Sequence, residues 1–144
     1  MKFYNIITNH RQSYISNKIK NMSDFEIEII QSLYKQFSMV EYTNEKEHEC
    51  MFAILNDPTL EKISNIYKTY DLDFKVVDMT KEVKFDINFR TSYKNEYGIS
   101  VKRKILNLIK EYKSNWIDKD DILDKILEKG IDSLTDFDLD ILNS

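Results

Sequence analysis

The sequence is poor in the residues that bend and cross-link a chain: it has two glycines, one proline and one cysteine among 144 residues. So few glycines argue against a glycine-rich phosphate-binding loop, and the scarcity of glycine and proline argues against long flexible linkers and most barrel or sandwich folds. The single cysteine, Cys50, cannot form a disulfide within the chain. We therefore expect regular helices and strands to dominate. No motif by itself names an activity.

Membrane-spanning and export signals are also missing from the sequence. No apolar run approaches the roughly 18 residues that a spanning helix needs. The first residues, MKFYNIITNHRQSY, have neither a long apolar core nor a small-residue cleavage pattern. With one unpaired cysteine, these features predict a cytoplasmic protein. Hydrophobic residues make up 42% and charged residues 32% of the chain, which is typical of a globular domain.

The net charge of −4 is unevenly distributed. Residues 1–80 hold nine Lys/Arg and twelve Asp/Glu, residues 81–115 hold nine and four, and residues 116–144 hold three and nine. The balance is therefore −3, +5 and −6. Solvated helix faces explain such blocks most simply. The alternatives are a basic surface that binds a partner and an acidic tail that covers this surface.

The first 80 residues predict an α+β domain. Residues 3–8 read as a strand, and Ser23 with Glu26 has the spacing of a capping box that starts a helix. Two strands follow, VEYTN and ECMFAIL, and then a helix with Asp57 as its cap and Pro58 at its first position. A last strand, DFKVVDM, completes the order strand, helix, two strands, helix, strand. This order predicts a ferredoxin-like (split βαβ) domain with a mixed sheet.

The next segment predicts one more strand and then a long helix. Residues 83–89, VKFDINF, alternate apolar and polar side chains, which indicates a fifth strand with one solvated face. Residues 101–116 place Val101, Ile105, Leu108 and Tyr112 on one helical stripe. We therefore expect an α+β domain over residues 1–116.

Residues 117–144 predict a separate acidic helical tail, packed on this domain or on a partner. Asp118 caps a first helix, Gly130 lies where the chain must leave that helix, and Thr135 caps a second one. We expect Gly130 to adopt a left-handed conformation, with Ile131 folded back on Ile126 in a Schellman ending. The apolar faces of this hairpin are narrow and need something to cover them.

The tail, DILDKILEKGIDSLTDFDLDIL, resembles the short C-terminal helical segment of rhomboid-family membrane proteins of Bacteroidetes. The shared features are a leucine-isoleucine pair, a Glu/Lys-Gly step, Asp-Ser-Leu-Thr and then acidic residues. The resemblance covers about 25 of the 144 residues. It implies a bacterial origin and no activity, and nothing in the remainder resembles a known family.

One segment, residues 89–104, combines cationic and aromatic side chains. Such a mixture suits single-stranded nucleic acid, because phosphates attract the charges and bases stack on the rings. The alternative is that the rings pack in the core while the lysines are solvated, and the isoelectric point near 5.3 favours it. The candidate residues for binding a partner or nucleic acid are Arg90, Tyr93, Lys94, Tyr97, Lys102, Arg103 and Lys104.

Other chemistry is sparse. His48 lies two residues from Cys50, but two ligands do not make a zinc site, and a charged edge leading into a core strand explains the spacing more simply. The acidic residues that follow position 118 lack the glycine and the terminal glutamate of a calcium-binding loop. We predict no metal, no cofactor and no catalytic residue, and hence no enzyme.

Two functions of different classes remain. The first is a non-catalytic, intracellular protein-binding or regulatory module, for which an immunity-type or inhibitor protein would be an example. The second is a single-stranded nucleic-acid-binding protein that uses residues 89–104. A salt-dependent gel shift would distinguish them.

Overall fold

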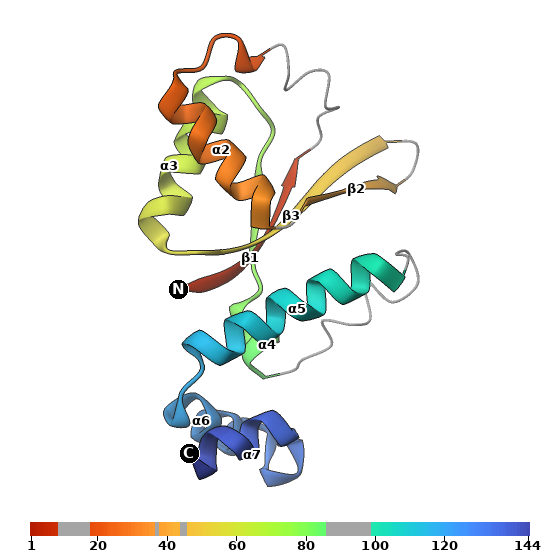
Figure 1. The fold of residues 1–144 in the computed structure, drawn as a ribbon, viewed down its shortest axis with the longest axis vertical. Helices are drawn as coiled ribbons and strands as arrows, with labels where there is room; N and C mark the ends of the chain where they lie inside the picture. Colours follow the sequence, from red (N-terminus) through yellow and green to blue (C-terminus); the bar gives the residue numbers. More distant parts are fainter. Residues whose placement is uncertain (9–17, 37, 44–45, 86–98) are drawn as a thin grey trace. The chain divides into compact units, whose positions relative to one another are not determined.

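The computed structural model describes residues 1–8, 18–36, 38–43, 46–85 and 99–144 (Figure 1). For residues 34–36, 38–43, 46–50 and 99–102 it describes the backbone alone. The chain divides into two compact units, an N-terminal unit of residues Met1–Met79 and a C-terminal unit of residues Thr80–Ser144. The predicted division after residue 116 follows charge and composition, and it stays a prediction.

The N-terminal unit consists of a sheet and two long helices. Its strands are β1 (Lys2–Thr8), β2 (Ser38–Thr43), β3 (Lys46–Leu55) and β4 (Lys75–Asp78). Its helices are α2 (Asp24–Gln36) and α3 (Asp57–Thr69). The elements expected over this part of the sequence are therefore present, in the expected chain order.

The strand order in the sheet is β2-β3-β1-β4, and all neighbours run antiparallel. Ile6 of β1 is paired with Met51 of β3 on one side and with Val76 of β4 on the other. The predicted ferredoxin-like domain with a mixed, five-stranded sheet is wrong in its sheet, because the described strands form a four-stranded sheet. No parallel pair occurs between the described strands, and the segment expected to begin a fifth strand begins with a helix instead.

That helix is α4 (Thr80–Lys84), the first element of the C-terminal unit. Val83 is buried in it, and the Phe85 N–H donates to the Lys81 carbonyl oxygen at 2.9 Å, which continues the helical turn. Residues 86–89, the rest of the expected strand, lie outside the described part of the chain.

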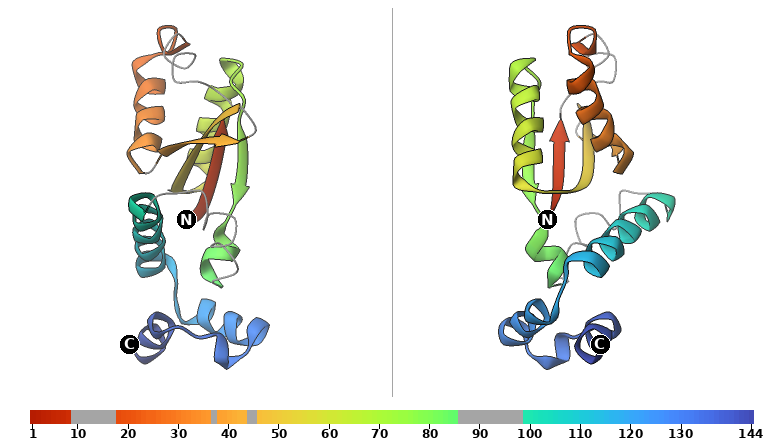
Figure 2. Two further views of the ribbon diagram at one scale, coloured as in Figure 1. Left: turned by 90° about the vertical axis from the view of Figure 1, so that its right-hand side faces the viewer. Right: turned by 60° about the vertical axis from the view of Figure 1, so that its left-hand side comes forward.

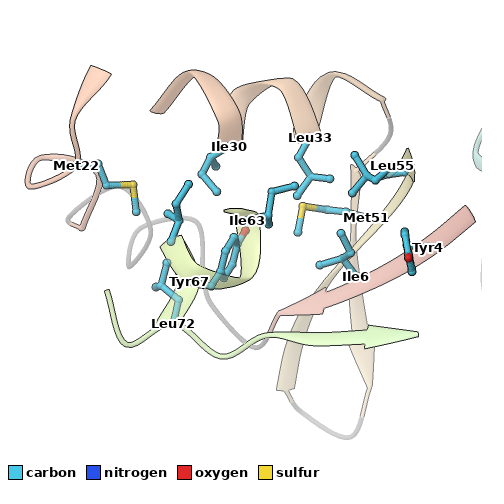
Figure 3. Close-up of a cluster of buried hydrophobic side chains, with 12 residues drawn as sticks. Tyr4, Ile6, Met22, Ile30, Leu33, Met51, Leu55, Ile63, Tyr67 and Leu72 are labelled. Atoms are coloured by element: carbon cyan, nitrogen blue, oxygen red, sulfur yellow. The ribbon is translucent and has the colours of Figure 1, made fainter. Parts of the chain in front are cut away.

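The core of the N-terminal unit lies between the sheet and helices α2 and α3 (Figures 2 and 3). Ile30 and Leu33 of α2 point toward Met51 and Ile6 of the sheet, and Tyr67 extends into the same cluster from α3. Residues 51–55 of β3 are all buried, so side chains that point to either face of this strand are shielded from solvent. Burial of this apolar surface is the main force that holds the sheet and helices together.

The signals that start the two long helices are partly as predicted. Ser23 and Glu26 form the expected capping box, because the Glu26 N–H donates to Ser23 Oγ and the Ser23 N–H donates to Glu26 Oε1. The cap of α3 is Asn56, whose Oδ1 accepts from the Thr59 N–H at 2.8 Å. The prediction of Asp57 as this cap is wrong. Asp57 instead accepts hydrogen bonds from the Tyr4 hydroxyl and from Lys2. These bonds, the one from Tyr4 above all, lower the pKa of Asp57.

The C-terminal unit continues with α5 (Ile99–Trp116), α6 (Lys119–Lys129), a short 3₁₀ helix η1 (Ile131–Ser133) and α7 (Asp136–Asn143). The predicted stripe of α5 is confirmed at Ile105, Leu108 and Tyr112, which are all buried. Helix α4 packs on α5, and α6 packs on both η1 and α7. The predicted helical tail is thus present as α6, η1 and α7, referred to below as the C-terminal hairpin.

Candidate functional site

The C-terminal hairpin is fixed locally by two capping boxes. Asp118 accepts from the Asp121 N–H at 3.0 Å, and Asp121 accepts from the Asp118 N–H at 3.1 Å. Thr135 and Asp138 make the same reciprocal pair at the start of α7. Both boxes satisfy backbone donors that the first turn of a helix leaves free, and their carboxylates lie at the positive end of the helix dipole. The two predicted caps are confirmed.

Gly130 ends α6 with a positive φ of 83°, as predicted. Its ψ is 162°, so the residue is extended and does not have the compact left-handed conformation of a Schellman ending. Its N–H donates to the Ile126 carbonyl oxygen at 2.8 Å, and the chain then turns through η1. Ile131 is 69% exposed, so the predicted fold-back of Ile131 onto Ile126 is wrong.

A buried ion pair joins α6 to α7. Lys125 Nζ donates to Asp138 Oδ2 at 2.6 Å, and both side chains are 1% exposed. The same oxygen accepts from the N–H and the hydroxyl of Thr135, both at 2.8 Å. Burial raises the pKa of Asp138, but the bonds from Lys125 and Thr135 outweigh it, so the pKa lies below its ordinary value. The hairpin is therefore closed by a charge pair that requires one particular alignment of the two helices.

Two further ion pairs attach the hairpin to α4. Lys81 Nζ lies 2.7 Å from Glu128 Oε1, and Lys84 pairs with Asp121. These contacts join the acidic tail to the basic segment of residues 81–115 within one chain. At the other side, Lys113 of α5 lies over the ring of Phe137, with Nζ 6.0 Å from its centroid. The hairpin thus packs on other parts of its own unit through charged as well as apolar contacts.

The opposite face of the hairpin carries apolar side chains in solvent. Leu123 and Leu127 of α6 are 50% and 85% exposed, and Ile131 of η1 follows four residues later. Residues four apart on a helix share a face, so Leu123 and Leu127 lie in one row along α6, and Ile131 follows after the chain leaves this helix at Gly130. We refer to Leu123, Leu127 and Ile131 as the exposed stripe. Leu139 of α7 is also 43% exposed.

Carboxylates accompany the exposed stripe. Asp120 and Asp124 belong to the exposed side of α6, and Asp132 follows Ile131 in η1. Within the described part of the chain none of these three takes part in an ion pair, whereas Asp121, Glu128 and Asp138 all do. One acidic side chain of the hairpin is therefore paired within the hairpin and two are paired with α4, while others face solvent beside apolar groups.

The structure brings together only part of the predicted binding segment. Arg103 and Lys104 are exposed on α5. Lys102 belongs to the first turns of α5, where the backbone alone is described. The remaining candidates, Arg90, Tyr93, Lys94 and Tyr97, lie outside the described residues, so their proximity to α5 stays a prediction.

The candidates for other chemistry gain no support. His48 and Cys50 lie in β3, opposite Glu41 and Met39 of β2, and so belong to the same face of the strand. Over the residues that the structure describes, no group of three or more His, Cys, Asp or Glu side chains could hold a metal ion. No helix among them is long and apolar enough to cross a membrane.

In comparisons with known proteins, neither a protein family, nor a curated protein, nor a solved structure matches this chain. The resemblance of the tail to a rhomboid-family segment therefore stays a prediction. Any functional statement has to come from the surface of the molecule itself.

Sequence reasoning found the hairpin but missed its exposed stripe. It placed Ile122, Leu123, Ile126 and Leu127 on this helix and expected something to cover its apolar face. In the structure Ile122 and Lys125 are buried, whereas Leu123 and Leu127 face solvent. The number of apolar residues on this helix could have indicated the exposed stripe, because one contact needs fewer than four of them.

Proposed function

We propose that this protein is a non-catalytic protein-binding module that uses its C-terminal hairpin to contact another protein. The observation that carries the proposal is the exposed stripe, above all Leu127 with 85% of its surface in solvent. Single exposed leucines are common on folded proteins, but three large exposed apolar side chains on one helix and the turn that follows it are typical of an interaction surface. Their burial by a partner would supply the main driving force for association.

The construction of the hairpin supports the same function. Two capping boxes, the Lys125–Asp138 pair and the ion pairs to α4 hold α6 in place before any partner arrives. A surface that is already ordered loses little conformational entropy on binding. This suits a regulatory or inhibitory protein whose action consists of occupying a partner, and cytoplasmic localisation belongs to the same proposal.

A pull-down from the native cells tests the proposal. We expect the wild-type protein to retain a specific set of proteins and the double variant Leu123→Ser/Leu127→Ser to lose it. Leu106→Ser is the matched control, because Leu106 is a leucine of α5 that is 40% exposed and lies outside the hairpin. Cross-links from the exposed Lys119 should map the retained protein to α6. If both variants retain the same proteins as the wild type, the hairpin is not the binding surface.

Nucleic-acid binding is the second candidate, and exposed Arg103 and Lys104 of α5 favour it. The exposed carboxylates of the hairpin act against it, since they repel a polyanion. A gel shift with single-stranded DNA that weakens steeply as salt rises would support this candidate. Loss of the shift in Arg103→Ala/Lys104→Ala, with Lys62→Ala/Lys68→Ala of α3 as a charge-matched control, would assign it to α5.

A further inference from the structure

We infer that the exposed stripe and its carboxylates bind a cationic amphipathic helix of another protein, laid alongside α6. This inference rests on the proposed function and adds the chemistry of the partner. It follows from the spacing of the stripe, from the hydrogen bonding of α6 and from the charges beside the stripe.

The spacing suits a helix. Leu123 and Leu127 are four residues apart, so their positions lie about 6 Å apart along the axis of α6. Side chains at this spacing form one of the ridges that fit between the side chains of a second helix. A partner helix with apolar residues three and four positions apart would cover both leucines, and Ile131 would extend the contact beyond the end of α6.

The hydrogen bonding of α6 argues against a partner that adds a β-strand. Strand addition needs a row of free N–H and C=O groups at a sheet edge. The backbone of α6 is bonded within the helix, its first turn is closed by the Asp118–Asp121 box, and its end is closed by the Gly130–Ile126 bond. Only side chains are available for recognition, which is the case when two helices pack.

The charge beside the exposed stripe indicates the sign of the charge on the partner. Asp120 and Asp124 lie on the exposed side of α6 and Asp132 lies just beyond it. The exposed cations of the same helix are Lys119 and Lys129, and Lys129 donates to the Phe85 carbonyl oxygen. Lysine or arginine side chains flanking the apolar row of the partner would face these carboxylates. Each exposed pair contributes little to affinity, but together they favour cationic helices and disfavour acidic ones.

Synthetic peptides test the inference directly. The first is a 15-residue peptide of leucine and lysine with leucine at helical spacing, the second has the same composition in a scrambled order, and the third replaces lysine by glutamate. Binding of labelled peptide to the full-length protein is measured by fluorescence anisotropy. We expect the amphipathic cationic peptide to bind at least about tenfold more tightly than either of the others, because it alone matches both features.

Variants connect this binding to the stripe. Leu127→Ser should weaken the binding of the cationic amphipathic peptide about tenfold or more, because the leucine that the peptide would bury is lost. Asp120→Asn/Asp124→Asn should weaken it severalfold and reduce its dependence on salt. Leu106→Ser and Glu61→Gln, an exposed leucine of α5 and an exposed carboxylate of α3, should leave it unchanged. Circular dichroism and Trp116 fluorescence verify that each variant is folded.

Four outcomes would overturn the inference. Equal binding of the scrambled peptide would mean that charge alone attracts it, and equal binding by Leu127→Ser would place the contact elsewhere. Sedimentation that shows a dimer abolished by Leu127→Ser would make a second copy the occupant. If the peptides fail while the pull-down still depends on the stripe, the proposed function stands and only the inferred partner chemistry is wrong.

Discussion

Replacing Gly130 by alanine should destabilise the C-terminal unit by about 1–2 kcal/mol. A Cβ built at this position meets nothing within 4 Å, so a clash with the surroundings contributes nothing to the cost. The cost comes from the backbone, because φ of 83° with ψ of 162° lies in a region that is essentially confined to glycine and costs other residues about 1–3 kcal/mol. The lower entropy of an unfolded alanine chain offsets about 0.4–1 kcal/mol of this.

Trp116 allows the loss of stability to be measured in the C-terminal unit itself. It is the one tryptophan of the chain and ends α5, so its fluorescence during urea unfolding reports on residues 80–144. Gly130→Asn should be about as destabilised as Gly130→Ala, because asparagine tolerates the compact left-handed conformation but not this extended ψ. Asp124→Ala is the control and should change the unfolding free energy by less than about 0.5 kcal/mol. An unchanged midpoint for Gly130→Ala, or wild-type stability for Gly130→Asn, would refute the reasoning.

Four further predictions concern charge and burial. Lys125→Met should cost roughly 3–5 kcal/mol, because Asp138 is left charged and buried, and Lys125→Met/Asp138→Asn should cost less in the same urea titration. Folding lowers the pKa of Asp138, so the charged side chain stabilises the folded protein above its unfolded pKa of about 4. This stabilisation is lost as the pH falls below that value, and the double variant should lack the loss. Cys50 pairs with Ile7 and Met39 on both sides of β3 and should react slowly with thiol reagents until denaturant is added, so rapid labelling of the native protein would contradict the prediction that its side chain is buried. Deleting residues 117–144 leaves 21 − 3 = 18 basic and 25 − 9 = 16 acidic side chains, a net charge of +2, and should strengthen retention on heparin at low salt, provided that circular dichroism shows the remainder folded.

The sequence predicted those elements whose signals are local. The strand of residues 3–8, the Ser23–Glu26 capping box and the stripe of α5 each depend on the residues of the element itself, and the structure contains all three. The cap of α3 was misplaced by one residue, because Asn56 and Asp57 are both good caps. The hydrogen bond from the Tyr4 hydroxyl, which occupies Asp57, comes from a residue 53 positions away.

The error at residues 83–85, where a helix replaces the start of the predicted strand, has the same origin. Alternation over so few residues also fits one turn of helix, since both structures bury Val83. What distinguishes them is distant in sequence: Lys81 and Lys84, three residues apart on one side of α4, pair with Glu128 and Asp121 of α6. These partners could not be assigned from the local pattern, so an exposed strand and a helix attached to the hairpin were equally consistent with it.

The charge of the hairpin also has a different meaning once its partners are known. The balance of −6 over residues 116–144 predicted solvated helix faces or, as an alternative, an acidic tail that covers a basic surface. Helical periodicity instead divides the carboxylates by face. Asp121 and Glu128 are seven residues apart and both turn toward α4, whereas Asp120 and Asp124 are four apart and turn outward with Leu123 and Leu127. The inward carboxylates hold α6 in place, and the outward ones are left to act on whatever covers the leucines. For this reason the sign of the charge on the partner can be inferred from the outward carboxylates alone. Neutralising the inward carboxylates should loosen the hairpin without changing which peptides it prefers.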